Sequence, residues 1–539
     1  MGAGQTGTGS DQYRAARDAK RQAIADSGRD PHGQRFSPSH TVLAARTLAP
    51  AAGVEGEASP RSEEVVRLAG RLGNIRKAGS KLRFATLYDR SRADAFMEQR
   101  RASVDVDAEV ELEAAEYKKQ RGVQLYLERE ALGDDFALVT QLDLADWVGV
   151  VGRMGRTKTG EITCFVESLV ILGKCMLPPP HQAGASTSEL SPEIRQRQRY
   201  LDLMMSDQSL ATFLMRSRLI DGIRRFFADR DFVEVETPMM HSILGGASAR
   251  PFVTHHNALD MDLYLRIAPE LHLKRLLVGG LERVFEINRN FRNEGLSPRH
   301  NPEFTMIEWY QAYTDHEELM DLTEALLRHL ADHVLGSRKL QWGEYSIDLD
   351  APFRRIAYDD ALREFAGLEY SDHAAVTAKA KSLGLDPKDF ATYDRLANEV
   401  WELTVEPHLI SPTFITDQPT WLTPLCRTQP ANPERTRRFE LFIARMELGN
   451  AYSELNDPDL QRQRFHQQLS EAEAADDDEA GIADGRIDED YCTALDYGLP
   501  YCGGEGMGID RLVMLFTGST SIRDVILFPT MRPEQVAEG

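Results

Sequence analysis

"FRNEGLSPRHNPEFTMIEWYQAY", residues 291–313, joins a turn-rich loop to a run with strand alternation. Side chains two apart on a strand share a face, so Phe304, Met306, Glu308 and Tyr310 are expected to lie together. The opposite face, which carries Trp309 and its alternate neighbours, is expected to pack against the protein core. A carboxylate on a partly apolar face requires a cation, so Glu308 predicts a charged ligand or an ion pair.

The run before this loop, "RVFEINRNFR" (283–292), predicts the partner strand of a hairpin. Gly295, Pro298 and Pro302 fit the long connection between the two strands. Arg292 ends the first strand near the start of the second, where a guanidinium can bind a phosphate or carboxylate through two hydrogen bonds. Phe304 offers a stacking surface. A hairpin with a salt-bridged glutamate and no ligand remains the alternative interpretation of these residues alone.

The composition sets broad limits on what the chain can do. With 539 residues it is too long for one hydrophobic core, so two or more domains are expected. The net charge of -22 is not typical of a nucleic-acid-binding protein, although a local basic face is enough for binding. No apolar run is long enough for a membrane span, and the polar N-terminus lacks a signal-peptide core. The scattered cysteines show no CxxC or zinc-finger spacing, which favours a reducing, cytoplasmic location.

The sequence predicts four successive parts. Residues 1–60 are expected to form a flexible tail, a helix and a linker. Short β-rich runs in residues 61–180 predict a small barrel of the OB type, with a charged insertion at about 90–120 in a hairpin loop. Residues 181–205 predict a hinge helix that begins at Ser191 and Pro192. Residues 206–539 mix helices and strands in an α+β order without regular βαβ alternation.

A second hairpin is predicted by "RFELFIARMELGNAYSELNDP" (438–458), with its turn near the Ala-Arg pair. Such a hairpin can bring Glu440 and Glu447 near each other. Two close carboxylates repel unless a cation lies between them, so a divalent metal is a candidate ligand. Farther along, three polar or aromatic side chains two apart share one face: Asn450, Tyr452 and Glu454.

A glycine-rich run, "YCGGEGMGIDRLVMLF" (501–516), leads into a predicted helix. The glycines permit close backbone approach to a ligand. Arg511 lies in the first turn of the helix, and the positive helix end favours an anionic ligand such as a nucleotide phosphate. Neither GxGxxG nor GxxxxGK[ST] is present, so Rossmann and P-loop nucleotide sites are not supported.

These segments together resemble the signature motifs of the class II aminoacyl-tRNA synthetases. "FVEVETPMM" (232–240) resembles motif 1, "FRNEGLSPRHNPEFTMIEWY" motif 2 and "GMGIDRLVMLF" (506–516) motif 3. Longer segments, among them "NAYSELNDP" and "SIRDVILFPTMRP", are similar to the lysyl-tRNA synthetases of subclass IIb. The resemblance covers roughly residues 11–535 and is looser in the barrel.

The resemblance implies the fold, the reaction and the partners. It implies a catalytic domain built on an antiparallel β-sheet flanked by helices, with an N-terminal OB-fold anticodon-binding domain. The expected reaction activates lysine with ATP to lysyl-adenylate and then esterifies the terminal adenosine of tRNA(Lys). Mg²⁺ and a homodimer are expected as well.

The resemblance also assigns roles to individual residues. For catalysis and ATP binding it implies Arg292, Glu294, His300, Phe304, Glu440 and Arg511, with Arg292 at the α-phosphate and Arg511 at the γ-phosphate. For the metal it implies Glu440 and Glu447. For lysine it implies Gly245, Gly246, Glu270, Glu308, Tyr310, Asn450, Tyr452 and Glu454. For the anticodon it implies Arg71, Phe84, Gln124 and Glu167, where the alternative is barrel core for Phe84 and surface for the others.

The pocket's charge bears on the choice of amino acid. Glu308 and Glu454 present two carboxylates, so the pocket is expected to select a cationic side chain over a neutral one. At about 4 Å and an effective dielectric near 20, each carboxylate–ammonium pair contributes on the order of 4 kcal/mol of attraction before desolvation. Exclusion of arginine requires a shape that the sequence does not reveal.

The chain departs from the family pattern before motif 3, where it reads "LPYCGGEGMGIDR". A carboxylate at Glu505 is expected to repel phosphate, bind metal or face solvent. Two alternatives to lysine–tRNA ligation therefore remain at this point. One is a paralogue that adenylates lysine but modifies a non-tRNA acceptor, and the other is a catalytically weak RNA-binding protein that uses the barrel.

Overall fold

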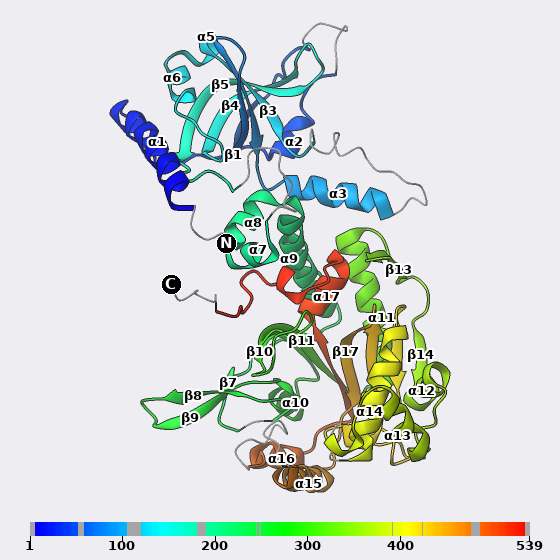
Figure 1. Ribbon diagram of the computed structural model, residues 1–539. Helices are drawn as coiled ribbons and strands as arrows, with labels where there is room; N and C mark the ends of the chain where they lie inside the picture. Colours follow the sequence, from blue (N-terminus) through cyan, green and yellow to red (C-terminus); the bar gives the residue numbers. More distant parts are fainter. Residues whose placement is uncertain are drawn as a thin grey trace. The chain divides into compact units, whose positions relative to one another are not determined.

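The structure is a computed structural model that describes residues 6–51, 59–104, 120–180, 190–243, 245–246, 249–390, 392–422, 424–475 and 486–533. The chain divides into two compact units, Met1–Leu214 and Met215–Gly539. Figure 1 follows the elements of each unit along the chain.

The first unit is built around a closed five-stranded barrel in the order β1-β2-β3-β5-β4, closed by pairing of β1 with β4. Alternate side chains point inward and are fully buried, among them Leu68 on β1, Leu125 on β3 and Val150 on β4. This barrel confirms the OB-like fold expected for this part of the chain. Its strands are β1 (Val65–Lys77), β2 (Leu82–Tyr88), β3 (Val123–Glu128), β4 (Trp147–Arg156) and β5 (Ile162–Gly173).

Short helices accompany the barrel. The inserted segment begins as helix α3, and residues 105–119 of it lie outside the described residues. The predicted cap at Ser191 is confirmed, because its hydroxyl oxygen accepts the amide N–H of Ile194 at 3.2 Å at the start of α7. The helices of this unit are α1 (Thr6–Asp26), α2 (Val42–Arg46), α3 (Arg92–Val104), α5 (Arg129–Leu132), η1 (Gly133–Asp135), α6 (Phe136–Val139), α7 (Pro192–Arg197) and α8 (Arg199–Met205).

The second unit is built on an eight-stranded sheet in the order β14-β15-β16-β17-β18-β11-β10-β6. The pairs β14–β15 and β10–β6 are parallel and the other neighbours are antiparallel. The mainly antiparallel sheet confirms the class II fold. Its strands are β6 (Val233–Glu234), β10 (Arg283–Phe291), β11 (Glu303–Ala312), β14 (Arg354–Ala357), β15 (Thr413–Thr416), β16 (Arg438–Ile443), β17 (Met446–Ser453) and β18 (Cys502–Gly508).

The two faces of β11 differ as the alternation predicts. Ile307 and Trp309 are fully buried, and the Trp309 ring lies 5.0 Å from that of Phe227 on helix α9 (Asp207–Ala228). Helices α11 (His316–Leu330) and α17 (Ile509–Thr517) also pack against this part of the sheet. Glu308 and Tyr310 point to the opposite face, where helix α10 (Glu270–Val278) lies.

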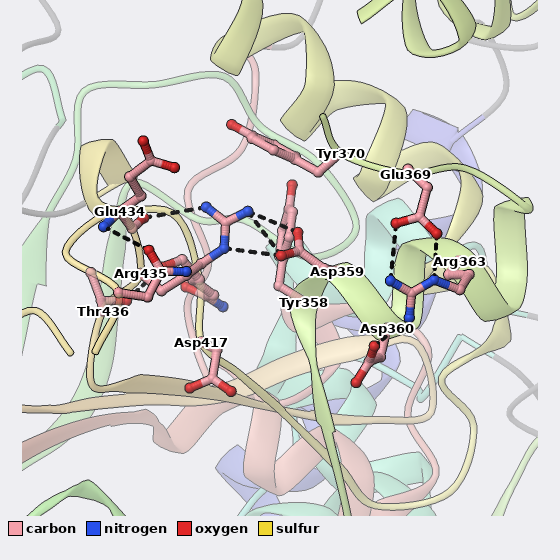
Figure 2. Close-up of polar contacts among 12 residues, drawn as sticks. Tyr358, Asp359, Asp360, Arg363, Glu369, Tyr370, Asp417, Glu434, Arg435 and Thr436 are labelled. Atoms are coloured by element: carbon pink, nitrogen blue, oxygen red, sulfur yellow. Dashed lines mark hydrogen bonds and ion pairs between the residues drawn. The ribbon is translucent and has the colours of Figure 1, made fainter. Parts of the chain in front are cut away.

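A block of three helices follows β14: α12 (Tyr358–Ala366), α13 (His373–Ser382) and α14 (Tyr393–Thr404). Figure 2 shows how a side chain from the loop before β16 is attached to this block. The guanidinium of Arg435 donates to both carboxylate oxygens of Asp359, in the first turn of α12, at 2.9 to 3.1 Å. It also lies 4.9 Å from the ring centre of Tyr370. A two-pronged ion pair beneath an aromatic ring fixes the first turn of the block to the loop.

The remaining elements of the second unit are short or peripheral. A three-stranded sheet has the order β7-β9-β8, and β12 pairs with β13. Their bounds, with those of the other helices, are β7 (Met240–His241), β8 (Phe252–His256), β9 (Met261–Leu265), η3 (Ala331–Leu335), β12 (Lys339–Trp342), β13 (Tyr345–Asp348), η4 (Pro387–Asp389), η5 (Glu406–His408), η6 (Thr420–Leu422), α15 (Pro458–Ala475), α16 (Glu489–Asp496) and η7 (Ile522–Asp524).

Candidate functional site

A cavity of about 390 Å³ lies over the central strands of the second unit. Strands β11, β17 and β18 form one wall, and α10 and the loop after β10 border it. Most of the residues expected at the ATP and lysine sites line it: Gly245, Gly246, Glu270, Arg292, Glu294, His300, Phe304, Glu308, Tyr310, Glu447, Asn450, Tyr452 and Arg511. Glu440 and Glu454 are not among its lining residues.

Glycines on β18 make room for the side chains of the cavity wall. Strand register places Gly506 opposite Glu308 and Gly504 opposite Tyr310. A Cβ atom at position 504 would overlap the Tyr310 ring and the carboxylate of Glu454. These glycines are therefore required by neighbouring protein side chains, in addition to any ligand.

Glu308 is a buried carboxyl group with little positive charge around it. Only 4% of the residue is exposed, and the Tyr310 hydroxyl donates to its Oε2 at 3.1 Å. Burial, followed by the neighbouring Glu270, raises the pKa of Glu308 to about 8. At neutral pH the empty cavity therefore holds a proton that a cationic ligand can replace.

A lysine that sequence reasoning missed lies behind this wall. The ammonium of Lys274, on α10, donates to Glu270 Oε1 at 2.6 Å and pairs with the carboxylate of Glu454. Lys274 is fully buried, and Glu454 is 1% exposed. Burial acts to lower the pKa of Lys274, but the two carboxylates outweigh it and raise the pKa well above its usual value. The available signal was the spacing of Glu270 and Lys274, four apart on one helix.

Glu270 is shared between two donors. Its Oε1 accepts the Tyr452 hydroxyl at 2.5 Å as well as the Lys274 ammonium. Glu270, Glu308 and Glu454 thus gather at one end of the cavity, with two tyrosines and one internal ammonium. Such an end is suited to positively charged groups.

The other end of the cavity carries arginines. Arg292 is half-buried, and its guanidinium lies 5.2 Å from the centre of the Phe304 ring. Its Nε is buried and has no hydrogen-bond partner. Burial lowers the pKa of Arg292, while Glu294 and Glu447 oppose that effect. A guanidinium with an unsatisfied donor is suited to a carboxylate or phosphate ligand.

Arg511 lies in the first turn of α17, as predicted. It donates to the backbone carbonyl of Glu447 at 2.7 Å and to its Oε2 at 3.2 Å. It also lies 3.1 Å from Nε2 of His300, whose Nδ1 is 2.9 Å from the Ser297 hydroxyl. Burial, Arg511 and Arg292 lower the pKa of His300, so its ring is neutral at pH 7 and Nε2 accepts from Arg511.

The predicted hairpin of β16 and β17 is confirmed, with Ala444 and Arg445 at positive φ in its turn. A bulge between Leu441 and Phe442 shifts the register by one residue, so Glu440 lies opposite Asn450, while Glu447 lies opposite Phe442.

The carboxylates of this hairpin have cationic neighbours. Arg438 bridges Glu440 at 2.6 Å and Asn450 at 2.9 Å. Burial raises the pKa of Glu440; Arg438 lowers it, and Glu447 raises it again. Within the part of the chain that the structure describes, no cluster of three or more His, Cys, Asp or Glu residues is placed to hold a metal. The pair fits a divalent cation only where a ligand supplies further oxygens.

The expectation for Glu505 is wrong. Register places it opposite Trp309 and Ala451, so its side chain points to the helix-covered face of the sheet. It is 1% exposed, and its Oε2 accepts the Thr323 hydroxyl of α11 at 2.6 Å. Burial raises its pKa well above the usual value, so it is a neutral buried acid. It does not face solvent, and although Glu505 is among the residues that border the cavity, its carboxyl group bonds to α11.

On the barrel, the structure brings three of the four expected anticodon residues to one region. Phe84 on β2 packs edge-on against Tyr126 of β3, which neighbours Phe165 of β5. Gln124 accepts the Thr163 hydroxyl on the same pair of strands, and Glu167 follows on β5.

Arg71 lies at the middle of β1. It pairs with Tyr88, and its guanidinium stacks 4.4 Å from the Trp147 ring. Arg76, which the sequence reasoning missed, lies 4.7 Å over Phe84. Aromatic rings with arginines over them are suited to unstacked bases.

The cysteines are all free thiols, and among the described residues no helix has the length and apolarity needed to span a membrane.

Comparison with known proteins places this geometry in context. Residues 191–532 match the family model described as tRNA synthetases class II (D, K and N). The chain is 44% identical to a lysine–tRNA ligase of Shouchella clausii over 97% of both chains. It is 51% identical to a lysine–tRNA ligase of Carboxydothermus hydrogenoformans, over 76% of this chain and 83% of the relative. It is 50% identical to the heat-inducible lysine–tRNA ligase of Escherichia coli K12, over 77% and 81%.

Proposed function

Since the chain belongs to the class II tRNA synthetases of the D, K and N group, we propose its reaction from that premise. It ligates L-lysine to tRNA(Lys) with ATP. A carboxylate oxygen of lysine attacks the α-phosphorus, which forms lysyl-adenylate and releases diphosphate. A hydroxyl of the terminal adenosine of the tRNA then attacks the lysyl carbonyl and releases AMP.

The two alternative functions are not favoured. The relatives described above are all named lysine–tRNA ligase, and one of them matches 97% of the chain, including the barrel. Neither a non-tRNA acceptor nor a purely RNA-binding role has a comparable observation in its favour.

The observation that carries the choice of lysine is the group of buried carboxylates at one end of the cavity. Burial and then the nearby Glu270 raise the pKa of Glu308, so the ε-ammonium of lysine would supply the charge that favours its ionised form. We assign Tyr310 and Tyr452 to the walls of this subsite, and Glu454 to the charge behind it. Glu270, with the backbone of Gly245 and Gly246, is assigned to the α-ammonium group.

The arginine end of the cavity is assigned to the reacting groups. Arg292 would hold the lysine carboxylate and the α-phosphate together and stabilise the charge that develops between them. Asn450 would orient the same carboxylate. The unsatisfied Nε of Arg292 and its position beside the cavity support this role.

The nucleotide is assigned to the groups around the motif 2 loop. Phe304 would stack on adenine, and Glu294 and His300 would contact the nucleotide. Arg511 would hold the γ-phosphate at the positive end of α17.

Magnesium is the metal that this family implies. Glu440 and Glu447 would hold it, since carboxylate oxygens are ligands that Mg²⁺ prefers and these two lie on neighbouring strands. When bound, Mg²⁺ neutralises phosphate charge, and the chain's own contribution is to keep these two carboxylates beside Arg438 and Arg511.

The barrel is assigned to the anticodon. Phe84 would stack on a base, while Gln124 and Glu167 would read base edges on the neighbouring strands. Arg71, at the middle of β1, would contact the backbone of the RNA.

We also propose a cytoplasmic homodimer. Free thiols suit a reducing compartment. Val233, Met239 and Met240 are each more than two-fifths exposed beside the first motif, and a second copy would cover them. Analytical ultracentrifugation tests the oligomeric state.

Lysine-dependent exchange between ATP and diphosphate, followed by transfer of labelled lysine to tRNA(Lys), tests the function. Both activities are expected. Absence of exchange contradicts the enzyme assignment, and exchange without transfer points to a different acceptor.

A further inference from the structure

Lys274 stands apart from the residues assigned above, because it is a buried ammonium that no substrate contact requires. It is fully buried in α10, and it does not line the cavity. Its ammonium is held by Glu270 at 2.6 Å and by Glu454, whose carboxylates come from different parts of the sheet and helix layers.

We propose that Lys274 is a positioning residue that sets the charge of the amino-acid pocket, so that the pocket accepts the two ammonium groups of a diamino acid. This inference rests on the proposed function. It extends that function by explaining how three carboxylates are held in one pocket before the substrate arrives.

The charge balance supports the proposal. When ionised, Glu270, Glu308 and Glu454 carry three negative charges, and Lys274 supplies one positive charge. Two negative charges remain, and these match the α-ammonium and ε-ammonium groups of lysine. Arg292 is left for the substrate carboxylate. Without Lys274 the negative charge of the three carboxylates would exceed the positive charge of the two substrate ammonium groups. Buried carboxylates without a counter-ion take up protons.

The other titratable groups around Lys274 add no charge to this balance. Besides the two carboxylates, the groups that face it are the hydroxyls of Tyr452 on β17 and Tyr491 on α16, and the thiol of Cys502 on β18. The hydroxyls and the thiol have pKa values that burial raises, so they stay neutral.

One ammonium therefore serves two carboxylates. Burial, Glu270 and Glu308 raise the pKa of Glu454, while Lys274, in direct contact with that carboxyl group, lowers it. Loss of Lys274 removes the group that favours the ionised form, so Glu454 would bind a proton that lysine would have to displace.

The orientation of Glu270 depends on the same ammonium. Lys274 and the Tyr452 hydroxyl both bond to Oε1 of Glu270, which fixes the carboxylate between them. Lys274 thus acts on the substrate through Glu270 and Glu454 and does not touch it.

Proton release on lysine binding tests the proposal directly. Calorimetric titration of the full chain with L-lysine, at pH 7 in two buffers of different ionisation enthalpy, gives the number of protons released. The wild type is expected to release about one proton, from Glu308. Lys274→Met is expected to release nearly two and to bind lysine at least tenfold more weakly, with ATP affinity unchanged.

A matched control removes a different cation from the same helix. Arg275 pairs with Asp488 at 2.7 Å and does not line the cavity. Arg275→Gln is expected to leave the proton count at about one. A role in helix stability alone would lower thermal stability in both variants and leave both proton counts at the wild-type value.

A charge-compensated double variant keeps the proposal testable even where Lys274→Met does not fold. Lys274→Met combined with Glu454→Gln removes one charge of each sign, and it is expected to fold and to release about one proton. A wild-type proton count in Lys274→Met overturns the proposal. So does an equal loss of ATP and lysine affinity, or a double variant that neither folds nor binds lysine. Failure of the proposed function is distinct, because the wild type itself would then bind no lysine.

Discussion

Glu308→Gln is the substitution that most directly tests the charge logic of the pocket. The pKa of Glu308 is raised from 4.5 to about 8, so at pH 7 only about a tenth of empty molecules carry it ionised. An incoming ammonium binds the ionised form. Lysine affinity is therefore expected to rise about tenfold between pH 6 and 7 and about fivefold between pH 7 and 8.

The magnitude for the variant follows from the same numbers. A carboxylate–ammonium pair at about 4 Å contributes on the order of 4 kcal/mol before desolvation, and ionising Glu308 at pH 7 costs about 1.4 kcal/mol of that. Loss of the carboxylate is expected to weaken lysine binding by about 2–3 kcal/mol, roughly 30- to 150-fold, and to remove the Glu308 part of the pH dependence.

The raised pKa of Glu308 also predicts that the stability of the ligand-free fold falls with rising pH, whereas lysine affinity rises. Because the folded pKa is raised, the stabilisation due to this group is fully present below about pH 4.5 and is lost as pH rises through about 8. The rise of the pKa from 4.5 to about 8 corresponds to about 5 kcal/mol in total. Without lysine, Glu308→Gln is expected to melt at a higher temperature than the wild type at pH 8.

The assay is calorimetric binding of lysine and of ATP between pH 6 and 8, with thermal melts of the ligand-free chain. Tyr310→Phe serves as a control, because it removes the hydroxyl that bonds to Glu308 and keeps the carboxyl group. Equal loss of lysine and ATP binding in Glu308→Gln, or an unchanged pH dependence, would refute the reasoning.

Three further predictions concern other parts of the molecule. Arg292→Lys is expected to lower lysine-dependent ATP–diphosphate exchange by about 10²–10³, since an ammonium cannot replace a two-pronged guanidinium; activity within tenfold of wild type would argue against the assigned role. Gly504→Ala is expected to weaken lysine binding more than ATP binding in parallel titrations, because the added methyl group overlaps Tyr310 and Glu454; equal effects on both ligands would contradict this. Phe84→Ala is expected to cost about 1–3 kcal/mol in tRNA binding and to leave ATP–diphosphate exchange unchanged, as measured by filter binding and exchange; a fall in exchange would show that the barrel residue acts on folding instead.

Much of the site was predictable because its signals are local. The alternation in residues 303–312 predicts which side chains of β11 face the cavity, and strand geometry carries that prediction into the structure. The turn at Ala444 and Arg445 and the start of α17 near Arg511 also follow from short patterns. Such features depend on residues adjacent in the chain, so they can be predicted from a single sequence.

Other features were decided only when distant segments met. Lys274 has an obvious partner in Glu270, four residues earlier on the helix, but nothing in the sequence places Glu454 against it. Glu505 lies among glycines that border the cavity, yet strand pairing turns its side chain to α11.

The sequence by itself therefore determined which side chains share a strand face or begin a helix, and the family resemblance supplied the roles predicted for them in binding ATP and lysine. The tertiary structure alone decided how many carboxylate charges in the pocket are compensated by a neighbouring cation. Charge compensation depends on distances of a few ångströms across separate strands and helices, and sheet register and bulges set those distances. A one-residue change of register would exchange Glu505 for its neighbouring glycines at the cavity wall and alter the charge that the substrate meets.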